Sequence, residues 1–281
     1  MIDNILKSID NIPAFPATVQ KVSALLNTDD YSAVEVANVI KYDQAITANI
    51  LRMSNSAYFG AHEKIYTIID AVTFLGQQNL IRAVQTAGVS KFYRKAAKGY
   101  VAKASDLWEH SVAVALMSQI LSKRVCCREN PVLYTAALMH DVGKVILGEF
   151  VHESFQKIME LVSDQGYSFL EAEEKIIGVD HGKLGGKIAA HWNFPKEIED
   201  AIAYHHRPDL LKDSESDVPW LVYLSDESCL MMGLDGGVDG LAHRWVGEGL
   251  TRFNLRSKDL EQSFILLAED LKRAKEMIAI V

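Results

Sequence analysis

The stretch AALMHDVGKVIL, residues 136–147, places His140 and Asp141 side by side within an apolar helical pattern. A charged aspartate is costly to bury after AALM unless another charge compensates it. A metal ion supplies that compensation, and a carboxylate that bridges two ions about 3.5–4 Å apart suits the attack of water on a phosphoryl group. Lys144 follows Asp141 by three residues, on the same face if the helix continues, where its ammonium can hold a phosphate. We therefore predict that His140 and Asp141 bind metal and that Asp141 and Lys144 are the catalytic residues of any reaction.

Further histidines and one more aspartate lie in similar settings. Each of them falls in or at the end of an apolar helical pattern, often beside an acid. Imidazole and carboxylate groups suit Fe, Mn, Zn or Ni ions, and the lack of cysteine in the set disfavours a structural zinc site. Asp106 precedes His110 by four residues and is predicted as an extra ligand or as an acceptor for that imidazole. The predicted ligands are His110, His140, Asp141, His181, His205, His206 and Asp226.

The adjacent pair His205–His206 bears on the number of ions. We expect its two imidazoles to point in different directions from a helix end, which Pro208 terminates. A site for one ion needs at most one of them, so binding by both would indicate two ions. Taken alone, a histidine in such a setting is more often a hydrogen-bonded core or surface residue than a ligand, and only the set as a whole favours metal binding.

Helix-end signals separate the other segments, nearly all of which have helical periodicity. Three pairs have the spacing of a capping box, in which a hydroxyl and a carboxylate satisfy free amides at a helix start. We expect Pro131 and Pro195 at first helical positions and three glycines at helix ends. These patterns predict an all-α protein of about a dozen helices. The capping pairs are Ser32 with Glu35, Thr67 with Asp70 and Ser168 with Glu171, and the glycines are Gly76, Gly166 and Gly178.

The basic run SKFYRKAAKGYVAK, residues 90–103, marks a change in the character of the chain. We interpret it as a connector or solvated helix face, with an anion-binding patch as the alternative. The predicted domain boundary lies within this run. It separates an N-terminal helical lobe, residues 1–95, from a C-terminal helical lobe, residues 96–281, which carries the metal site and a C-terminal helical extension.

Composition places the chain among ordinary folded proteins, with 49% hydrophobic and 23% charged residues in a length of 281. The formal net charge of -8 gives no overall attraction to nucleic acid or to an anionic membrane. No apolar run reaches the roughly 18 residues that span a bilayer. The start, MIDNILKSIDNIP, lacks the basic end and unbroken apolar stretch of a secretory signal. We therefore expect a cytoplasmic protein that binds neither membrane nor nucleic acid.

The order of the predicted ligands resembles that of a known superfamily. His110, then His140 with Asp141, then Asp226 is similar to the HD superfamily of metal-dependent phosphohydrolases, named after the central His-Asp pair. The added His181 and His205–His206 resemble the branch that includes the HD-GYP cyclic-di-GMP phosphodiesterases. Three N-terminal segments, NIPAFPATVQKV, IKYDQAITANILRMSNSAYFG and TIIDAVTFLGQQNLIRAV, resemble the HDOD family closely. This resemblance covers roughly residues 9–230.

The HDOD resemblance implies a bacterial regulatory or signal-transduction module with an HD-domain-like helical bundle in its C-terminal lobe. Many HDOD proteins have lost metal ligands, whereas this chain has histidine or aspartate at every corresponding position. It also differs from the cyclic-di-GMP enzymes. Arg207 stands where their glutamate follows the paired histidines, and no GYP triplet follows it. The resemblance therefore implies metal binding more strongly than it implies hydrolysis of cyclic-di-GMP.

Three hypotheses follow. The first is a signalling protein whose HD-like lobe binds one or two transition-metal ions, with iron expected before Mn, Zn or Ni, and whose N-terminal lobe contacts a protein partner or a second copy. The second is an active phosphohydrolase that acts on a nucleotide, a phosphodiester or another phosphorylated small molecule through Asp141 and Lys144. The third is a non-catalytic interaction scaffold. It fits the N-terminal lobe, where Asp43, Arg52 and Asn55 are expected to cap or pair structurally.

Overall fold

The protein is described here from a computed structural model, which covers residues 2–26, 31–93, 100, 104–126, 130–211, 216–235 and 248–274. These residues form fourteen α-helices and one 3-10 helix, and no strand occurs among them. The all-α prediction is therefore confirmed. None of the described helices is long and apolar enough to cross a membrane.

The chain divides into two compact units. The larger unit consists of residues 1–12 and 92–267, and the smaller unit consists of residues 13–91 and 268–281. The first helix thus groups with the larger unit, where it packs on α8 and α10. The predicted boundary after residue 95 falls within residues 94–99, which lie outside the described residues, so it stays a prediction.

The smaller unit is built on α2 (Ala17–Leu26), α3 (Ala33–Ile40), α4 (Gln44–Ser54) and most of α5 (Ile68–Tyr93). Its capping signals are confirmed, because Ser32 and Thr67 each accept a hydrogen bond from the backbone N–H three residues later. The predicted stop at Gly76 is a break inside α5, where φ of 65° and ψ of 176° depart from helical values. Glycine adopts such a positive φ without the strain that a side chain would bring.

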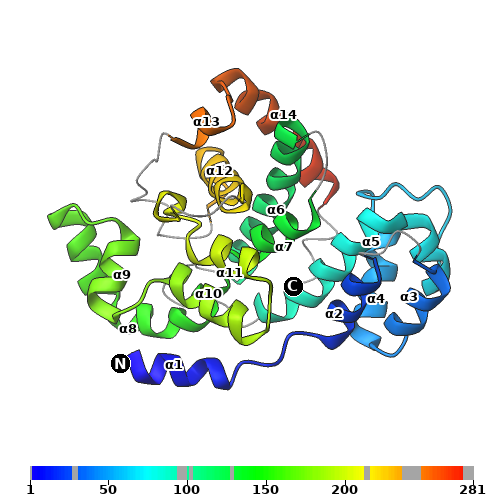
Figure 1. The fold of residues 1–281 in the computed structure, drawn as a ribbon, viewed down its shortest axis with the longest axis horizontal. Helices are drawn as coiled ribbons and strands as arrows, with labels where there is room; N and C mark the ends of the chain where they lie inside the picture. Colours follow the sequence, from blue (N-terminus) through cyan, green and yellow to red (C-terminus); the bar gives the residue numbers. More distant parts are fainter. Residues whose placement is uncertain are drawn as a thin grey trace. The chain divides into compact units, whose positions relative to one another are not determined.

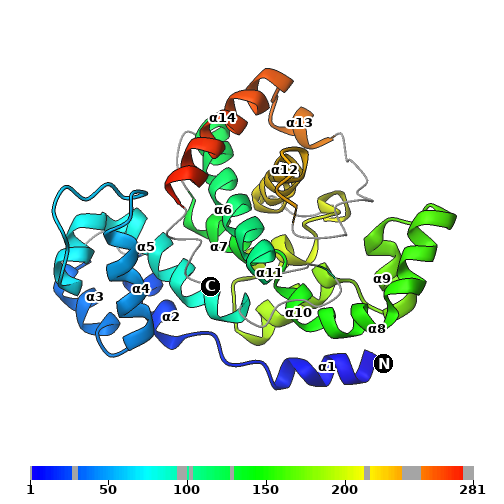
Figure 2. The same ribbon diagram turned by 180° about the vertical axis from the view of Figure 1, so that it is seen from behind.

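Helix α7 lies at the centre of the larger unit, in contact with α6, α11 and α12, while α10 packs on α8 and α11 (Figures 1 and 2). The core among these helices contains Trp108, Tyr134 and Tyr223, all fully buried. The helices of this unit are α1 (Ile2–Asp10), α6 (Ala104–Cys126), α7 (Pro131–Met139), α8 (Val142–Gln165), α9 (Phe169–Ile177), α10 (His181–His191), α11 (Lys196–Ala203), η1 (Pro208–Leu210), α12 (Val218–Met231), α13 (Glu248–Arg252) and most of α14 (Ser257–Arg273).

Helix α7 begins as the sequence predicts and ends just before the His-Asp pair. The Asn130 side chain accepts hydrogen bonds from the backbone N–H groups of residues 132 and 133, and Pro131 occupies the first helical position. The helix ends at Met139, and α8 begins at Val142. His140 and Asp141 therefore stand at a break between two helices. The condition that the helix continues through them is wrong, although Lys144 still reaches Asp141.

Three of four other predicted helix ends are confirmed. Ser168 and Glu171 form a reciprocal capping box at the start of α9, and Gly166 and Gly178 end α8 and α9 in the left-handed conformation, as expected. Pro195 is not the first helical residue. It is the residue before α11, with a ψ of 146° that is extended rather than helical.

Gly143 allows α8 and α10 to approach one another closely. A Cβ at this position would overlap the backbone carbonyl oxygen of His181 and would lie 2.9 Å from the backbone nitrogen of Gly185. Both neighbours are backbone atoms, so a side-chain rotation cannot relieve the overlap. The glycine two residues after Asp141 thus brings the start of α8 against the start of α10.

We predict that Gly143→Ala lowers the free energy of unfolding by about 1–3 kcal/mol, because the two helices must separate to admit the methyl group. Urea denaturation followed by circular dichroism measures this change. Gly182→Ala is the matched control, because its Cβ meets its closest neighbour, the carbonyl oxygen of Ala203, at 3.1 Å and needs a much smaller adjustment. Equal losses in the two variants would contradict the explanation.

Candidate metal centre

The structure brings together all seven predicted ligands, although they come from five parts of the chain. His110 lies within α6, and Asp226 lies within α12. His140 and Asp141 occupy the break after α7, His181 is the first residue of α10, and His205 and His206 follow α11. Three overlapping groups have ligand atoms within 4.8 Å of one another: His181, His205 and His206; His110, His140 and Asp141; and His140, His205 and Asp226.

The two aspartates connect two sets of histidines. Oδ1 of Asp141 lies 3.5 Å from Nε2 of His181, and its Oδ2 lies 3.3 Å from Nε2 of His140. Oδ1 of Asp226 lies 3.1 Å from Nε2 of His110, and its Oδ2 lies 3.9 Å from Nδ1 of His206. Each carboxylate therefore offers one oxygen to each set, which is the arrangement of a bridging ligand.

Four of the histidines are oriented by a hydrogen bond from the outer ring nitrogen. Nδ1 of His110 contacts the carbonyl oxygen of Leu234 at 2.6 Å, and Nδ1 of His140 and of His205 contact backbone carbonyls at 2.7 Å. Nδ1 of His181 contacts a carboxylate oxygen at 2.8 Å. Carbonyl and carboxylate oxygens only accept, so each Nδ1 carries the proton and donates it. In the neutral imidazoles, each Nε2 then presents a lone pair to the interior.

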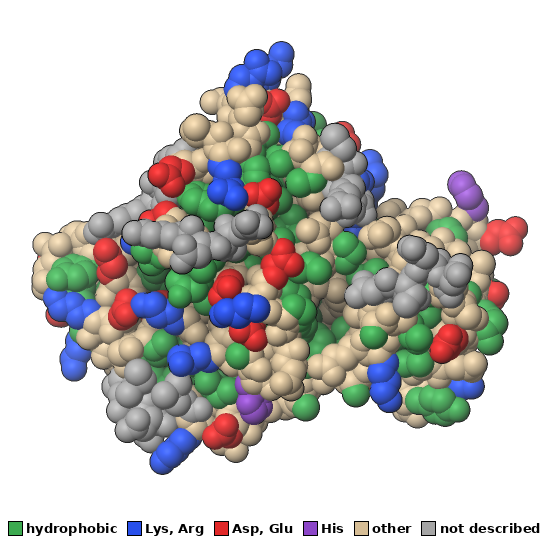
Figure 3. Space-filling view, viewed as in Figure 1, with side chains coloured by type: hydrophobic (Ala, Val, Ile, Leu, Met, Phe, Trp, Pro, Cys, Tyr) green, Lys and Arg blue, Asp and Glu red, His purple; other side chains and the backbone are tan. Residues whose placement is uncertain are grey.

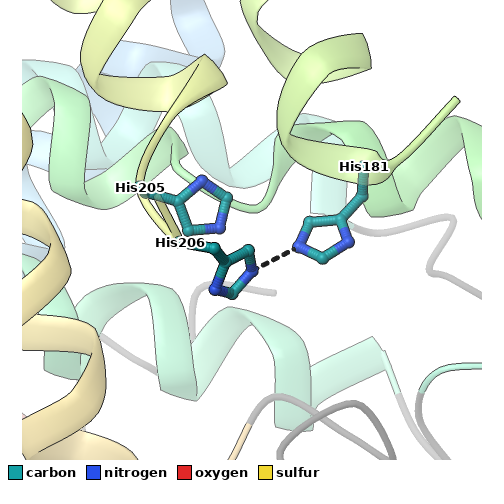
Figure 4. A group of neighbouring side chains, drawn as sticks. All are labelled: His181, His205 and His206. Atoms are coloured by element: carbon teal, nitrogen blue, oxygen red, sulfur yellow. Dashed lines mark hydrogen bonds between the residues drawn. The ribbon is translucent and has the colours of Figure 1, made fainter. Parts of the chain in front are cut away.

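The inner ring nitrogens face one another at short distances. The Nε2 atoms of His110 and His140 lie 3.3 Å apart, and those of His181 and His206 lie 2.8 Å apart, as the dashed line in Figure 4 shows for the second pair. The lone pairs of neutral His110 and His140 repel one another at this distance unless a cation, either a proton or a metal ion, lies between or beside them. The geometry of the centre thus requires positive charge.

The pair His205–His206 differs from its prediction in one respect. We expected the two rings to point in different directions, but their centroids lie only 4.0 Å apart and both rings enter the same cluster (Figure 4). The chain turns directly after α11, and this turn places the neighbouring rings side by side. Their nitrogens still face different carboxylates, because Nε2 of His205 lies 3.7 Å from Oδ1 of Asp141 and His206 faces Asp226.

Two buried polar atoms of the centre have no hydrogen-bond partner among the described residues, and both fit a metal ligand. They are Oδ1 of Asp141 and Nε2 of His205. An unpaired polar atom in the interior costs free energy that a metal ion would recover. The donor set of imidazoles and carboxylates also suits a transition metal. The residues present therefore fit a metal ion.

Burial and neighbouring charges shift the pKa values of these groups in different directions. Burial raises the pKa of the Asp141 carboxyl, but the charges of His140 and Lys144 outweigh it and hold that pKa well below its usual range. Burial, with His140 and His181 nearby, lowers the pKa of His205 to about 3. Burial also lowers the pKa of His181, but the Glu173 carboxylate outweighs it and raises that pKa to about 9.

Lys144 and Tyr100 contact the edge of the centre. Nζ of Lys144 donates to Oδ2 of Asp141 at 2.7 Å, and the lysine side chain is 2% exposed. The same ammonium lies 5.7 Å from the centre of the Tyr100 ring, and that ring meets the His181 ring edge-on at 6.0 Å. The lysine thus compensates part of the negative charge of Asp141 instead of extending into solvent.

Glu173 is a residue of the centre that the sequence reasoning missed. Its carboxylate is fully buried, accepts from both the backbone N–H and the Nδ1–H of His181, and also accepts from the Tyr100 hydroxyl. A signal was present, because Glu173 stands at helical spacing between the buried Phe169 and Ile177, on the apolar face of α9. An acid on such a face needs a buried partner.

Asp106 does not join the centre. It belongs to none of the three ligand groups, and its carboxylate accepts from the Ser105 hydroxyl in the first turn of α6. The Leu234 carbonyl takes the place at Nδ1 of His110 that we predicted for this aspartate. Helical spacing put Asp106 on the correct side of α6, but the chain after α12 supplies a nearer acceptor.

The polar residues singled out in the N-terminal segments have structural roles. Asp43 caps α4 by accepting from the backbone N–H of Ile46, and Arg52 donates to Asn49. The Asn55 side chain exchanges two hydrogen bonds with the backbone of Ile65, which closes the loop between α4 and α5.

The HDOD domain family matches residues 12–208, which is more than half of the chain. The chain therefore belongs to the HDOD family, and the resemblance drawn from its sequence segments is confirmed.

Solved structures share the whole fold. An HDOD domain protein of unknown function from Geobacter sulfurreducens is 26% identical with a TM-score of 0.76, over 99% of this chain and 95% of that chain. A Shewanella amazonensis protein, provisionally named as a phosphohydrolase, is 21% identical with a TM-score of 0.70, over 98% of this chain and 96% of that chain.

An uncharacterized Treponema pallidum protein is 21% identical over 206 residues, which are 72% of this chain and 39% of that protein. The chain thus spans about two fifths of the length of this curated relative.

The pKa of His205 generates a pH-dependent prediction for the metal-free protein. Between about pH 3 and pH 6.5 the unfolded chain binds a proton at His205 that the folded protein does not bind. The stability that His205 contributes is therefore lost as the pH falls below 6.5. His205→Leu removes this loss, so wild type should lose up to about 1.4 kcal/mol more than the variant per pH unit.

Urea denaturation with a chelator present, at pH 7 and again near pH 5, measures this difference. The control is His152→Leu, because His152 is an exposed histidine of α8. A parallel loss of stability in wild type and His205→Leu would show that His205 takes up its proton inside the folded protein.

Proposed function

We propose that this chain is a bacterial regulatory protein of the HDOD family whose larger unit binds two transition-metal ions. One observation carries the proposal: the two pairs of facing imidazole nitrogens are joined by two carboxylates that each reach both pairs. His181, His205 and His206 would hold one ion, His110 and His140 would hold the other, and Asp141 and Asp226 would be shared. Two ions would give each pair of facing imidazoles a metal to bind, whereas one ion would leave one pair without a metal.

The donor set bears on which metal binds. Five imidazoles and two carboxylates, without a thiolate, suit iron and also suit Mn, Zn or Ni. We propose iron, in line with the sequence-based expectation. The charges also favour divalent or higher cations, because the carboxylates of Asp141, Asp226 and Glu173 are buried beside the single ammonium of Lys144.

Burial of the ligands favours a regulatory centre over a freely accessible active site. The side chains of the ligands are at most 3% exposed, apart from His206 at 11%. A centre that is closed in this way can hold ions and transmit their presence to the surrounding helices, whereas binding of a large substrate would require the helices to move.

We further propose a cytoplasmic location and contact with a protein partner or a second copy through the smaller unit. Apolar side chains of this unit are exposed, with Tyr42 at 83% and Tyr66 at 73%. Exposed aromatic side chains are frequent where proteins associate. On the face drawn in Figure 3, acidic and basic side chains are intermingled, in keeping with a partner other than nucleic acid.

We predict that the full chain, purified without metal-affinity resin from cells grown with iron, contains two transition-metal ions per chain by elemental analysis. Asp141→Ala should lose most of this metal, because it removes the oxygens that face both sets of histidines. Asp106→Ala is the matched control and should retain it, because Asp106 lies one helical turn from His110 but outside the ligand groups.

The proposal would be contradicted if the wild-type protein stayed free of metal at every concentration of iron, manganese, zinc and nickel tested. Retention of metal by Asp141→Ala would contradict the sharing of this carboxylate. If Asp106→Ala lost its metal while its circular dichroism spectrum stayed unchanged, Asp106, in the first turn of α6, would have to be counted among the ligands.

A phosphohydrolase is the second candidate function, and the position of Lys144 favours it. Its buried ammonium lies 2.7 Å from Oδ2 of Asp141, and movement away from this oxygen would offer a positive charge to a phosphate at the centre. The provisional name of the Shewanella amazonensis neighbour points the same way. Bound metal ions would supply an activated water and charge stabilisation for phosphoryl chemistry. Lys144 would position the phosphate, and Asp141 would hold the ammonium beside the centre until a phosphate binds.

This candidate predicts turnover of bis-p-nitrophenyl phosphate or of a nucleotide in the presence of Mn, Fe, Ni or Zn ions. Lys144→Gln should reduce the turnover about 100-fold, because it removes a charge that stabilises the transferring group. Lys183→Gln should keep full activity, because Lys183 pairs with Glu174 and Asp180 away from the centre. If no metal-dependent turnover is found, or if Asp141→Ala does not abolish it, this candidate is excluded and only the regulatory function remains.

A further inference from the structure

We infer that Glu173 and Tyr100 make the two halves of the centre unequal, so that the ion held by His181, His205 and His206 binds first and more tightly. This inference rests on the two-ion centre proposed above. It assigns Glu173 and Tyr100 as positioning residues, which act on the metal through His181.

Glu173 places a carboxyl group behind the ring of His181. A carboxylate that accepts from the outer nitrogen of a metal-binding imidazole fixes the ring and makes its inner nitrogen a stronger donor. Glu173 does this for His181, with 2.8 Å between its Oε2 and Nδ1. His110, His140 and His205 donate instead to neutral backbone carbonyls. Among these four histidines, His181 alone has an acid behind it.

Hydrogen bonds to both of its oxygens hold the Glu173 carboxyl group in place. These oxygens receive three hydrogen bonds, from the backbone N–H and the Nδ1–H of His181 and from the Tyr100 hydroxyl. Because the group is fully buried, these donors take the place of solvating water. The Tyr100 hydroxyl occupies the oxygen that His181 does not contact, and it thereby fixes the carboxylate plane against the imidazole.

Lys144 lies on only one side of the centre. Its ammonium lies 2.7 Å from Oδ2 of Asp141, which is the oxygen on the side of His110 and His140. Oδ1, on the side of His181 and His205, has no hydrogen-bond partner in the part of the chain that the structure describes. A cation near His110 and His140 therefore competes with an ammonium for its oxygen, whereas a cation near His181 meets a free one. Asp226 lies closer to His110 but also faces His206, so it offsets this difference only in part.

Titration of the full-length, chelator-treated protein with Co²⁺ tests the inference, because calorimetry gives the affinity of each step and visible absorption reports the ligands of each ion. Wild type should bind two ions in two resolved steps. Glu173→Gln should weaken the first step by about 10–100-fold, shift the absorption of the first equivalent and leave the second step within about threefold. His110→Ala should remove the second step and leave the first.

Two further variants separate positioning from structure. Glu174→Gln is the matched control, one residue along α9, where the carboxylate pairs with Lys183 and is half exposed, and it should leave both steps unchanged. Tyr100→Phe keeps the ring and the carboxylate but removes the hydroxyl, so it should weaken the first step by about tenfold. If Glu173→Gln loses its helical circular dichroism spectrum, Tyr100→Phe carries the test.

The outcomes distinguish this inference from the proposed function. A single Co²⁺ per wild-type chain would overturn the two-ion centre and the inference with it. The inference alone would be overturned if wild type bound two ions and the first step were unchanged in Glu173→Gln and Tyr100→Phe. It would also be overturned if these variants weakened both steps equally. Loss of the first step in His110→Ala would reverse the order of binding and overturn it as well.

Discussion

The burial of the Asp141 carboxylate is the constraint on which the rest of the larger unit depends. This group is fully buried at the break between α7 and α8, where an uncompensated charge would destabilise the fold. Lys144 compensates part of the charge, and histidines from three other parts of the chain surround the remainder. Positive charge on or among these imidazoles, from protons or from metal ions, is therefore a condition of the fold as well as of the function.

Backbone geometry then decides how the ligands are presented. Backbone carbonyls fix three of the imidazoles, and Gly143 lets the start of α8 meet the start of α10 without an intervening side chain. Ligands held by main-chain atoms lose little freedom when an ion binds, which favours high affinity. The same rigidity limits substrate entry, and for this reason the geometry supports regulation more directly than hydrolysis.

The two halves of the centre differ in the charges behind their ligands. Glu173 supports His181, whereas Lys144 occupies an oxygen on the side of His110 and His140. Arg207, which replaces the glutamate expected from the resemblance to cyclic-di-GMP phosphodiesterases, pairs with Asp209. In the proposed two-ion centre, the halves would fill at different metal concentrations.

The helical class, several helix starts and the seven candidate ligands could be predicted from the sequence, because capping residues, apolar periodicity and buried acids can be read from neighbours in the chain. The sequence also pointed to Lys144, whose contact with Asp141 spans three residues. The tertiary structure alone decided the break at His140–Asp141, the side-by-side rings of His205 and His206, and the exclusion of Asp106. It also decided the roles of Glu173 and the Leu234 carbonyl. These features depend on which distant segment supplies the nearest hydrogen-bond acceptor, and residue spacing within a helix does not contain that information.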